Sequence, residues 1–453
     1  MERILLLFLF ISTIDVFSQN AKCDWVKSFP KDSMILGYTV NSKDEVICIG
    51  INKEEELFSV IYDPAGKLVS ENTFQLLEDD ACIGTEDDEI HEKMLCSKND
   101  KVYFVGCMED RRLEITNYKT GSDKRDESDF VFIAELDKKG KLKELHPIIS
   151  YVYGVDISIT GIVIGEQEEI VIALQAEPDL NKEPDEDEYA LTIGTRKFVL
   201  GEADFKEFVI RIGKGSIVEW VKCIDVDQSA LGSKANGSDD MLFKSLALDA
   251  EGNSYRLLNF RGKAMAEGKE IFLRPAKEQV KDLGTVIKYS AEGNLLWAKS
   301  YGSVSGILDI TSCGNNLMLV GIFESDFSQD GFSFVNKPPS EDMAMFSISQ
   351  VNGKIMGMSA DTSSFSVKGD YNTMDKKFYA LGDNKVFSLD RKMKPLKAFP
   401  WWGDNPGFRI FNGKAYMMLD CKRNWNEVDL AGKKYWSREN KRFFAKISFP
   451  VKK

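Results

Sequence analysis

Four tryptophans near the C-terminal end of the sequence are the residues best suited to hold a ligand. Trp401 and Trp402 are adjacent in the segment 399–406, and Trp425 and Trp436 follow in a long polar segment. Indole rings combine a large flat apolar face with an N–H donor, which suits stacking on a sugar ring or on a peptide side chain. Packing beneath surface loops is the alternative for Trp401, Trp402, Trp425 and Trp436, so their ligand-binding role is a hypothesis.

Clustered carboxylates could bind a cation or supply a general acid and base. Asp and Glu are dense at 78–80, 86–89, 177–179 and 183–188. No segment has the spaced oxygen ligands of a calcium loop. The abundance of carboxylates also singles out no pair that could flank a glycosidic bond. We expect solvated acidic segments, no metal site and no cofactor, with a calcium or cationic-partner site as the alternative.

Histidine and cysteine chemistry has little support in the sequence. The two histidines, His91 and His146, lie outside any H-E-x-x-H pattern, and no G-x-S-x-G pattern occurs. The eight cysteines include no C-x-x-C pair. Most lie singly in apolar strands, as Cys48 does between Ile47 and Ile49, which is typical of small buried residues. We therefore assign no catalytic residue.

The N-terminal segment and the net charge bear on location and partners. Residues 1–18 combine a short, weakly basic start, an apolar run from Ile4 to Ile11 and a cleavage site before Gln19, which is typical of a signal peptide. We expect an exported chain (periplasmic, cell-surface or secreted) whose mature part is a monomer with no transmembrane segment. The formal net charge of −13 argues against a nucleic acid partner.

A repeated β-hairpin must position these residues. Apolar strands flank a Gly-containing turn at 58–68, 130–140, 208–215 and 286–295, with weaker copies at 345–353 and 386–393. Alternation with a period of two around a polar turn indicates a hairpin. Another hairpin precedes each of these, and a seventh lies at 408–419. Inner and outer hairpins together predict four-stranded antiparallel blades, the unit of a β-propeller.

The seventh outer hairpin is split between the two ends of the chain. Residues 443–449 supply one strand, after which the sequence ends. The fourth strand of two blades begins with tryptophan, at Trp220 and Trp297, and the mature N-terminus carries the similar run Trp25-Val-Lys-Ser-Phe29. Because an open edge exposes unpaired backbone groups, we predict that residues 23–29 complete the last blade. The predicted fold is an all-β, seven-bladed β-propeller closed by its N-terminal strand.

The repeat resembles the bacterial extracellular β-propeller repeat family (the SBBP type). The residues that carry this resemblance are 286–302, followed by Leu319-Val-Gly-Ile-Phe323, and the turn Leu248-Asp-Ala-Glu-Gly-Asn-Ser-Tyr255. The resemblance implies a propeller fold and an exported location. It implies no activity and no functional residues.

The predicted organisation is a signal peptide at 1–18 and a single propeller domain at 19–453. The blades are expected near 31–75, 90–150, 153–227, 242–303, 305–362, 364–400 and 407–449 with 23–29. Long segments at 75–90, 108–128, 175–206, 227–241, 259–284, 324–342 and 421–441 are expected to emerge on one face. Insertions gathered on one face usually mark a binding face.

Two hypotheses about function remain open. The first is an exported, noncatalytic binding or scaffold protein that takes a glycan or protein ligand on its long-loop face. The second is a glycan-active hydrolase or lyase with carboxylates at the mouth of the pore. The absence of a catalytic motif favours the first.

Overall fold

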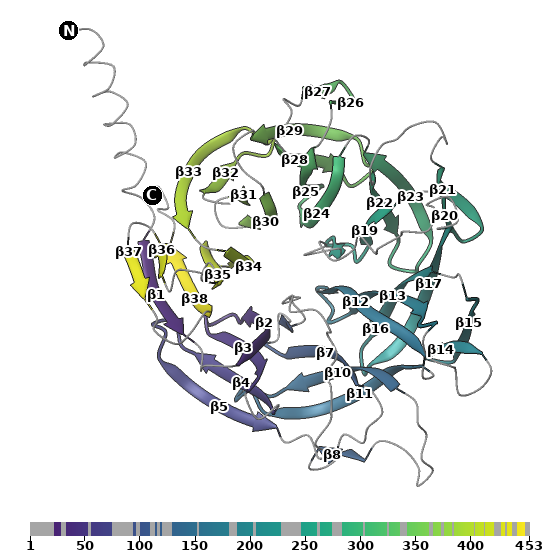
Figure 1. Ribbon diagram of the computed structural model, residues 1–453, viewed down its shortest axis with the longest axis horizontal. Coiled ribbons are helices and arrows are strands. Elements are labelled where there is room, and N and C mark those ends of the chain that lie inside the picture. The colour runs from purple at the N-terminus through teal and green to yellow at the C-terminus, as the bar shows by residue number, and fades with distance from the viewer. Residues whose placement is uncertain are drawn as a thin grey trace. The chain divides into compact units, whose positions relative to one another are not determined.

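Every element in the described part of the chain is a β-strand (Figure 1). The computed structural model describes residues 22–28, 33–52, 56–74, 94–96, 100–108, 114–115, 118–119, 129–151, 154–180, 188–202, 205–227, 246–260, 263–273, 283–301, 304–323, 326–335, 342–361, 366–372, 376–382, 385–402, 404–411, 413–420, 427–430, 433–436 and 442–448. Within these ranges there is no helix of the length and apolar character needed to cross a membrane. The predicted signal peptide lies outside them.

The strands form seven antiparallel blade sheets, which confirms the predicted all-β seven-bladed propeller. The chain divides into two compact units, Ser33–Ile310 and a second made of Met1–Asp32 with Thr311–Lys453. The boundary between the units falls within β24 (Val304–Cys313).

The first unit contains blades one to four. Blade one comprises β2 (Met34–Val40), β3 (Val46–Ile51), β4 (Leu57–Tyr62) and β5 (Leu68–Phe74), and blade two comprises β6 (Met94–Cys96), β7 (Val102–Met108), β10 (Asp129–Leu136) and β11 (Leu142–Tyr151). Blade three comprises β12 (Val155–Ile164), β13 (Ile170–Pro178), β16 (Phe205–Gly213) and β17 (Ile217–Asp227), and blade four comprises β18 (Leu246–Leu248), β19 (Ser254–Phe260), β22 (Leu283–Tyr289) and β23 (Leu295–Tyr301).

Blades six and seven lie in the second unit, together with all of blade five beyond the boundary in β24. Blade five comprises β24, β25 (Asn316–Phe323), β28 (Asp342–Ser349) and β29 (Ile355–Asp361), and blade six comprises β30 (Ser366–Asn372), β31 (Lys377–Gly382), β32 (Lys385–Leu389) and β33 (Pro395–Trp402). Blade seven comprises β34 (Asp404–Phe411), β35 (Lys414–Asp420), β38 (Arg442–Ser448) and β1 (Lys22–Ser28).

One turn geometry recurs in the hairpins and explains the Gly-bearing signal in the sequence. In blade one, Asp63 N donates to Lys67 O over 2.9 Å, and Gly66 N donates to Asp63 O over 2.8 Å. Gly66 has a φ of 79°, a conformation that glycine adopts without steric cost. The same pair of backbone hydrogen bonds closes the turns at 41–45, 137–141, 165–169, 249–253, 290–294 and 390–394.

The hydrophobic cores lie between neighbouring blades. Val131 and Ile133 of blade two pack with Ile172 and Leu174 of blade three in one buried cluster. Other clusters join blades one and two, three and four, five and six, and six and seven. Each strand therefore buries side chains against the adjacent blade, which is how stacked repeats build a continuous core.

The N-terminal strand completes blade seven, as predicted. Strand β1 pairs antiparallel with β38, and Figure 1 shows purple β1 beside yellow β38. Trp25 lies opposite Lys446, which in turn lies opposite Tyr416 on β35. The Lys446 ammonium is 5.7 Å from the Tyr416 ring centre, and the Trp25 ring is 5.8 Å from that of Phe444.

Blade four repeats this row of aromatic and cationic residues. Tyr255 lies opposite Lys288, which lies opposite Trp297, and the Lys288 ammonium is 5.1 Å from the Tyr255 ring centre. The tryptophan that identified the closing strand in the sequence is therefore a packing residue at a repeated position.

Three blades carry an additional hairpin that extends their sheets to six strands. Strands β14 (Tyr189–Ile193) and β15 (Arg196–Leu200) extend blade two, β20 (Lys263–Ala266) and β21 (Lys269–Leu273) extend blade three, and β36 (Glu427–Leu430) and β37 (Lys433–Trp436) extend blade six. Each hairpin belongs to the long segment between the second and third strands of one blade but pairs with the outer strand of the blade before it. Two further hairpins, β8 (Glu114–Ile115) with β9 (Tyr118–Lys119) and β26 (Phe327–Gln329) with β27 (Phe332–Phe334), form separate two-stranded sheets.

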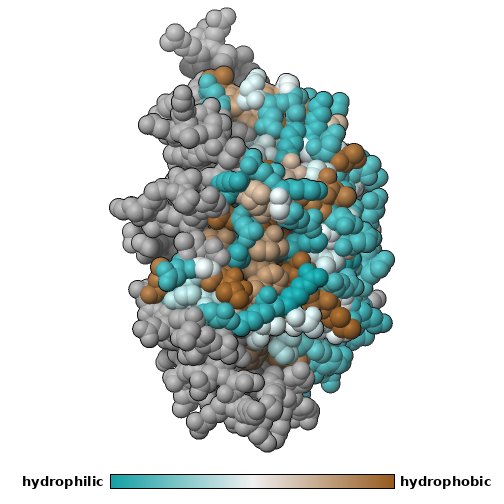
Figure 2. Space-filling model, turned by 90° about the vertical axis from the view of Figure 1, so that its right-hand side faces the viewer, coloured by the Kyte–Doolittle hydropathy of each residue, from teal (hydrophilic) through white to brown (hydrophobic). Residues whose placement is uncertain are grey.

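The outer side of the first unit mixes polar and apolar side chains. Figure 2 shows hydrophobic groups set among hydrophilic ones on the side where Figure 1 places β20, β21 and β23. Exposed apolar residues of these outer strands and hairpins include Val199, Ile217 and Leu296. Such residues are ordinary on a folded surface when they occur singly.

Candidate functional site

Blade six brings together the backbones of three of the four candidate tryptophans. Trp401 and Trp402 end β33, where they lie opposite Leu430 and Asp429 of β36. Trp436 ends β37, the next strand of the same sheet. Residues far apart in the sequence therefore meet in one six-stranded sheet, because the β36–β37 hairpin of blade seven extends blade six.

Other candidate segments fall on parts of the chain that the structure does not describe. Trp425 lies outside the described residues, as do the acidic runs at 78–80 and 86–89 and most of the run at 183–188. Glu177 is described, at the end of β13 opposite Asp156. Burial and the neighbouring Asp156 carboxylate raise the pKa of Glu177.

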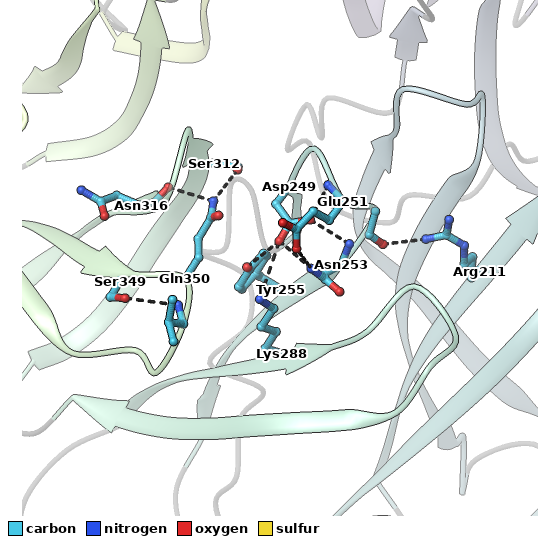
Figure 3. Close-up of polar contacts among 12 residues, drawn as sticks. Arg211, Asp249, Glu251, Asn253, Tyr255, Lys288, Ser312, Asn316, Ser349 and Gln350 are labelled. Carbon is cyan, nitrogen blue, oxygen red and sulfur yellow. Dashed lines mark hydrogen bonds and ion pairs between the residues drawn. The ribbon is translucent and has the colours of Figure 1, made fainter.

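A cluster of polar side chains surrounds the inner turn of blade four (Figure 3). Asp249 Oδ1 accepts the backbone N–H groups of Glu251 and Asn253 at 3.0 and 2.9 Å. Its Oδ2 accepts the Asn253 amide and the Tyr255 hydroxyl, each at 2.8 Å. The Lys288 ammonium lies 3.7 Å from the same oxygen.

The hydrogen bonds of this cluster stabilise the turn. The Asp249 carboxylate accepts four hydrogen bonds and lies beside the Lys288 ammonium, so its acceptor sites are used within the turn. Burial, and then the hydrogen bond to Asp249, raise the pKa of Tyr255, which keeps its hydroxyl protonated. The segment 248–255, one of three on which the family resemblance rests, is therefore a turn stabilised by its own side chains.

Inner-turn contacts continue from blade to blade. Arg211 of blade three donates from Nη1 to Gly252 O at 2.8 Å, as Figure 3 shows, and lies 3.4 Å from the Glu169 carboxylate. In blades one and two, the Ser42 backbone and hydroxyl both donate to Asp100, at 2.9 and 2.8 Å. The Ser42 N–H lowers the pKa of Asp100 because it favours the charged carboxylate.

A buried charged group spans blades three and four. Arg256 Nη2 donates to Glu207 Oε2 at 2.5 Å, and Gln175 Nε2 donates to Glu207 Oε1 at 2.6 Å. The Arg256 and Glu207 side chains are 0% and 1% exposed. Arg256 Nε and Nη1 have no hydrogen-bond partner among the described residues. Neither residue stands out in the sequence, because Arg256 lies in the apolar strand β19, Glu207 follows Lys206 in β16, and no local pattern indicates that the two pair.

The described residues form neither a metal-binding cluster nor a disulfide at Cys48. Among these residues, no three His, Cys, Asp or Glu side chains gather closely enough to hold a metal ion. Cys48 carries a buried thiol that forms no disulfide. Burial raises the pKa of this thiol, so it stays protonated and weakly nucleophilic.

Comparison with known proteins finds similarity in structure but not in sequence. No family model matches the chain, and no curated protein matches it. BamB from Moraxella catarrhalis aligns over 95% of this chain and 100% of its own, with 6% identity and a TM-score of 0.42. The β-propeller domain of the Trilobed protease from Pyrococcus furiosus aligns over 90% and 99%, with 10% identity and a TM-score of 0.47. The Dos1 propeller aligns over 96% and 98%, with 10% identity and a TM-score of 0.43. At these identities the similarity concerns the fold alone.

Proposed function

We propose that this chain is an exported, noncatalytic binding protein that takes a glycan or protein ligand at the tryptophan-bearing end of blade six. The observation that carries the proposal is the pairing of β33 with β36, which places Trp401 and Trp402 in the same sheet as Trp436. Tryptophans gathered in this way are typical of binding hot spots, because each contributes a large contact area with few rotatable bonds.

Export is the second part of the proposal. The signal-peptide pattern of residues 1–18 supports it, and so does the resemblance of residues 286–302 to extracellular propeller repeats. A propeller suits a binding role because its blades form a rigid support for the segments that join them. Membership of the extracellular repeat family is part of this proposal.

The test compares the mature protein with two variants on one panel of immobilised oligosaccharides and extended peptides. We expect the double variant Trp401→Ala, Trp402→Ala and the single variant Trp436→Ala each to weaken binding of the same probe by about tenfold or more. Val335→Ala removes an exposed apolar side chain elsewhere and should leave binding unchanged.

Thermal unfolding of each variant separates lost binding from lost folding. If both tryptophan variants fold and bind every probe as tightly as the wild-type protein, the proposed site at Trp401, Trp402 and Trp436 is refuted. Turnover of an oligosaccharide on the panel would instead favour the glycan-active alternative.

A further inference from the structure

The outer hairpin turns of blades five and six expose cationic and apolar side chains side by side. Val351 and Lys354 are exposed in the first turn, Val351 at 79%, and Met356 at the start of β29 is 52% exposed. In the second turn, three cations precede an apolar residue that is 44% exposed. These residues are Arg391, Lys392, Lys394 and Leu396. We call these seven residues (Val351, Lys354, Met356, Arg391, Lys392, Lys394 and Leu396) the turn patch.

The first turn of the patch is held in one conformation by Gln350. Figure 3 shows the Gln350 side chain directed at Ser312 and Asn316, where Nε2 donates to Ser312 Oγ at 2.9 Å and to Asn316 O at 3.1 Å. The Gln350 backbone N–H also donates to Asn315 O at 3.1 Å. Val351 and Lys354 therefore project from a turn that is anchored to the inner hairpin of its own blade.

The second turn is closed by its own acidic residue. Asp390 Oδ1 accepts the backbone N–H groups of Lys392 and Lys394 at 2.8 and 2.9 Å. Met393 adopts a φ of 63° and is fully buried, so it anchors the turn between these two exposed lysines. The cationic side chains are thus presented by ordered backbone.

Strand β29, which follows the first turn, lies against the second turn at Gly357. A methyl group added to Gly357 would lie 2.5 Å from the carbonyl oxygen of Lys392. An added methyl group would clash at this distance, so the close approach of β29 to the 390–394 turn requires glycine. Lys354 and Met356 belong to one side of this junction, and the cations of blade six to the other.

The turn patch has the opposite sign to the chain as a whole. The patch has four cationic side chains, and the described carboxylates bonded to its backbone are Asp390 and Asp330 of the β26–β27 turn, which accepts Ile355 N at 2.9 Å. The local charge is therefore positive, whereas the whole chain has a formal net charge of −13. A local positive charge of this kind attracts an anionic partner even though the net charge of the whole chain is negative.

The first unit repeats the combination independently. In blade one, Leu68 and Val69 are exposed beside Lys67, and the adjoining turn of blade two carries Lys138 and Lys139. The two blades meet there through a hydrogen bond of 2.8 Å from Ser70 Oγ to Lys139 O.

We propose that the turn patch binds the surface of an anionic phospholipid bilayer. Lipid headgroups carry negative charge at high density above an apolar layer, and proteins that lie on such surfaces pair cations with apolar side chains that enter the boundary. Exposed Val351, Met356 and Leu396 suit that boundary, whereas a soluble polyanion would use the cations alone. This surface is distinct from the tryptophan-bearing end of blade six, so either proposal can fail without the other.

The test is sedimentation of the mature protein with vesicles of phosphatidylglycerol and phosphatidylcholine, compared with phosphatidylcholine alone. We expect binding to the anionic vesicles that weakens as salt is raised. The variant Arg391→Ala, Lys392→Ala, Lys394→Ala should bind about a hundredfold more weakly, because each cation near an anionic surface contributes roughly fivefold and the three factors multiply. The variant Val351→Ser, Leu396→Ser should lose roughly tenfold, through apolar area no longer buried.

A matched control removes one arginine and two lysines from other exposed positions. Arg196, Lys214 and Lys269 are exposed in the first unit, and their joint replacement by alanine should leave vesicle binding at the wild-type level. Equal losses of vesicle binding in the control and patch variants would overturn the proposal. Equal binding of the wild-type protein to vesicles with and without phosphatidylglycerol would overturn it as well.

Dextran sulfate serves as the soluble polyanion. Tighter binding to dextran sulfate than to vesicles, with no effect of Val351→Ser, Leu396→Ser, would assign the patch to anionic polymers and refute the lipid proposal.

Discussion

The contact between Glu207 and Arg256 places two opposite charges in the buried boundary between blades three and four. Both side chains are buried, and Gln175 supplies a second donor to the carboxylate. Two opposite charges held in low dielectric are expensive to separate but contribute little beyond a well-packed apolar pair. The pair therefore selects which surfaces meet more than it raises the total stability.

Removing one residue of the Glu207–Arg256 pair should destabilise the folded protein. We expect Glu207→Leu to lower the free energy of unfolding by about 3–5 kcal/mol, because it leaves the Arg256 guanidinium buried without its carboxylate. The double variant Glu207→Leu, Arg256→Met should recover most of that loss. Urea unfolding followed by tryptophan fluorescence measures both.

An exposed ion pair provides the comparison. Lys206 and Asp225 lie 2.9 Å apart with the Asp225 side chain 61% exposed, so Asp225→Asn should cost less than about 1 kcal/mol. A Glu207→Leu variant as stable as Asp225→Asn would contradict the inferred role of the buried pair.

At the scale of elements, the added hairpins connect consecutive blades. The β14–β15 hairpin pairs through its backbone with β11 of blade two. Its side chains Leu191, Ile193 and Leu200 are buried with residues of blade three, and Phe198 lies 5.0 Å from Phe208. One hairpin thus bonds to one blade and packs on the next, which closes an edge that would otherwise be exposed.

The two sides of this hairpin should respond differently to truncation. Leu191→Ala should lower the free energy of unfolding by about 2–5 kcal/mol, because it opens a cavity in the core between blades two and three. Val199→Ala, at an exposed position of the same hairpin, should change it by less than about 0.5 kcal/mol. Similar changes in the free energy of unfolding for the two substitutions would show that the hairpin does not stabilise the contact between the blades.

At the scale of the whole molecule, the two ends of the chain share one blade. Strand β1 supplies the outer edge of blade seven, with Cys23 and Trp25 buried and Asp24 accepting the Ser448 hydroxyl at 2.5 Å. Pairing of the chain ends is slow to form because the partners are the most distant in sequence. Completion of blade seven is therefore expected to be a late step of folding.

Loss of the closing strand should destabilise the protein. Trp25→Ala should lower the free energy of unfolding by about 3–5 kcal/mol, since it empties the position beside Phe444. Deletion of residues 22–28 should lower the melting temperature further, and a peptide of that sequence should restore part of the loss. Lys27→Ala on the same strand serves as the control. A deletion variant that melted at the wild-type temperature would contradict closure by β1.

The sequence by itself determined the blades, because a hairpin is a local structure. Alternating apolar residues and a left-handed residue at positions such as Gly66 specify each strand pair without reference to the rest of the chain. The split last blade was equally predictable, since Trp25 repeats the position of Trp220 and Trp297.

Only the tertiary structure decided which blade each added hairpin joins. From the sequence, the segment 175–206 is expected only as a long connection, whereas Tyr189–Leu200 forms the β14–β15 hairpin, and nothing local specifies that it pairs with β11 of the preceding blade. The same holds for β36 and β37, whose pairing with β33 places Trp436 in the sheet of Trp401. Edge pairing and buried charge contacts depend on which surfaces meet in space, and residue types alone do not carry that information.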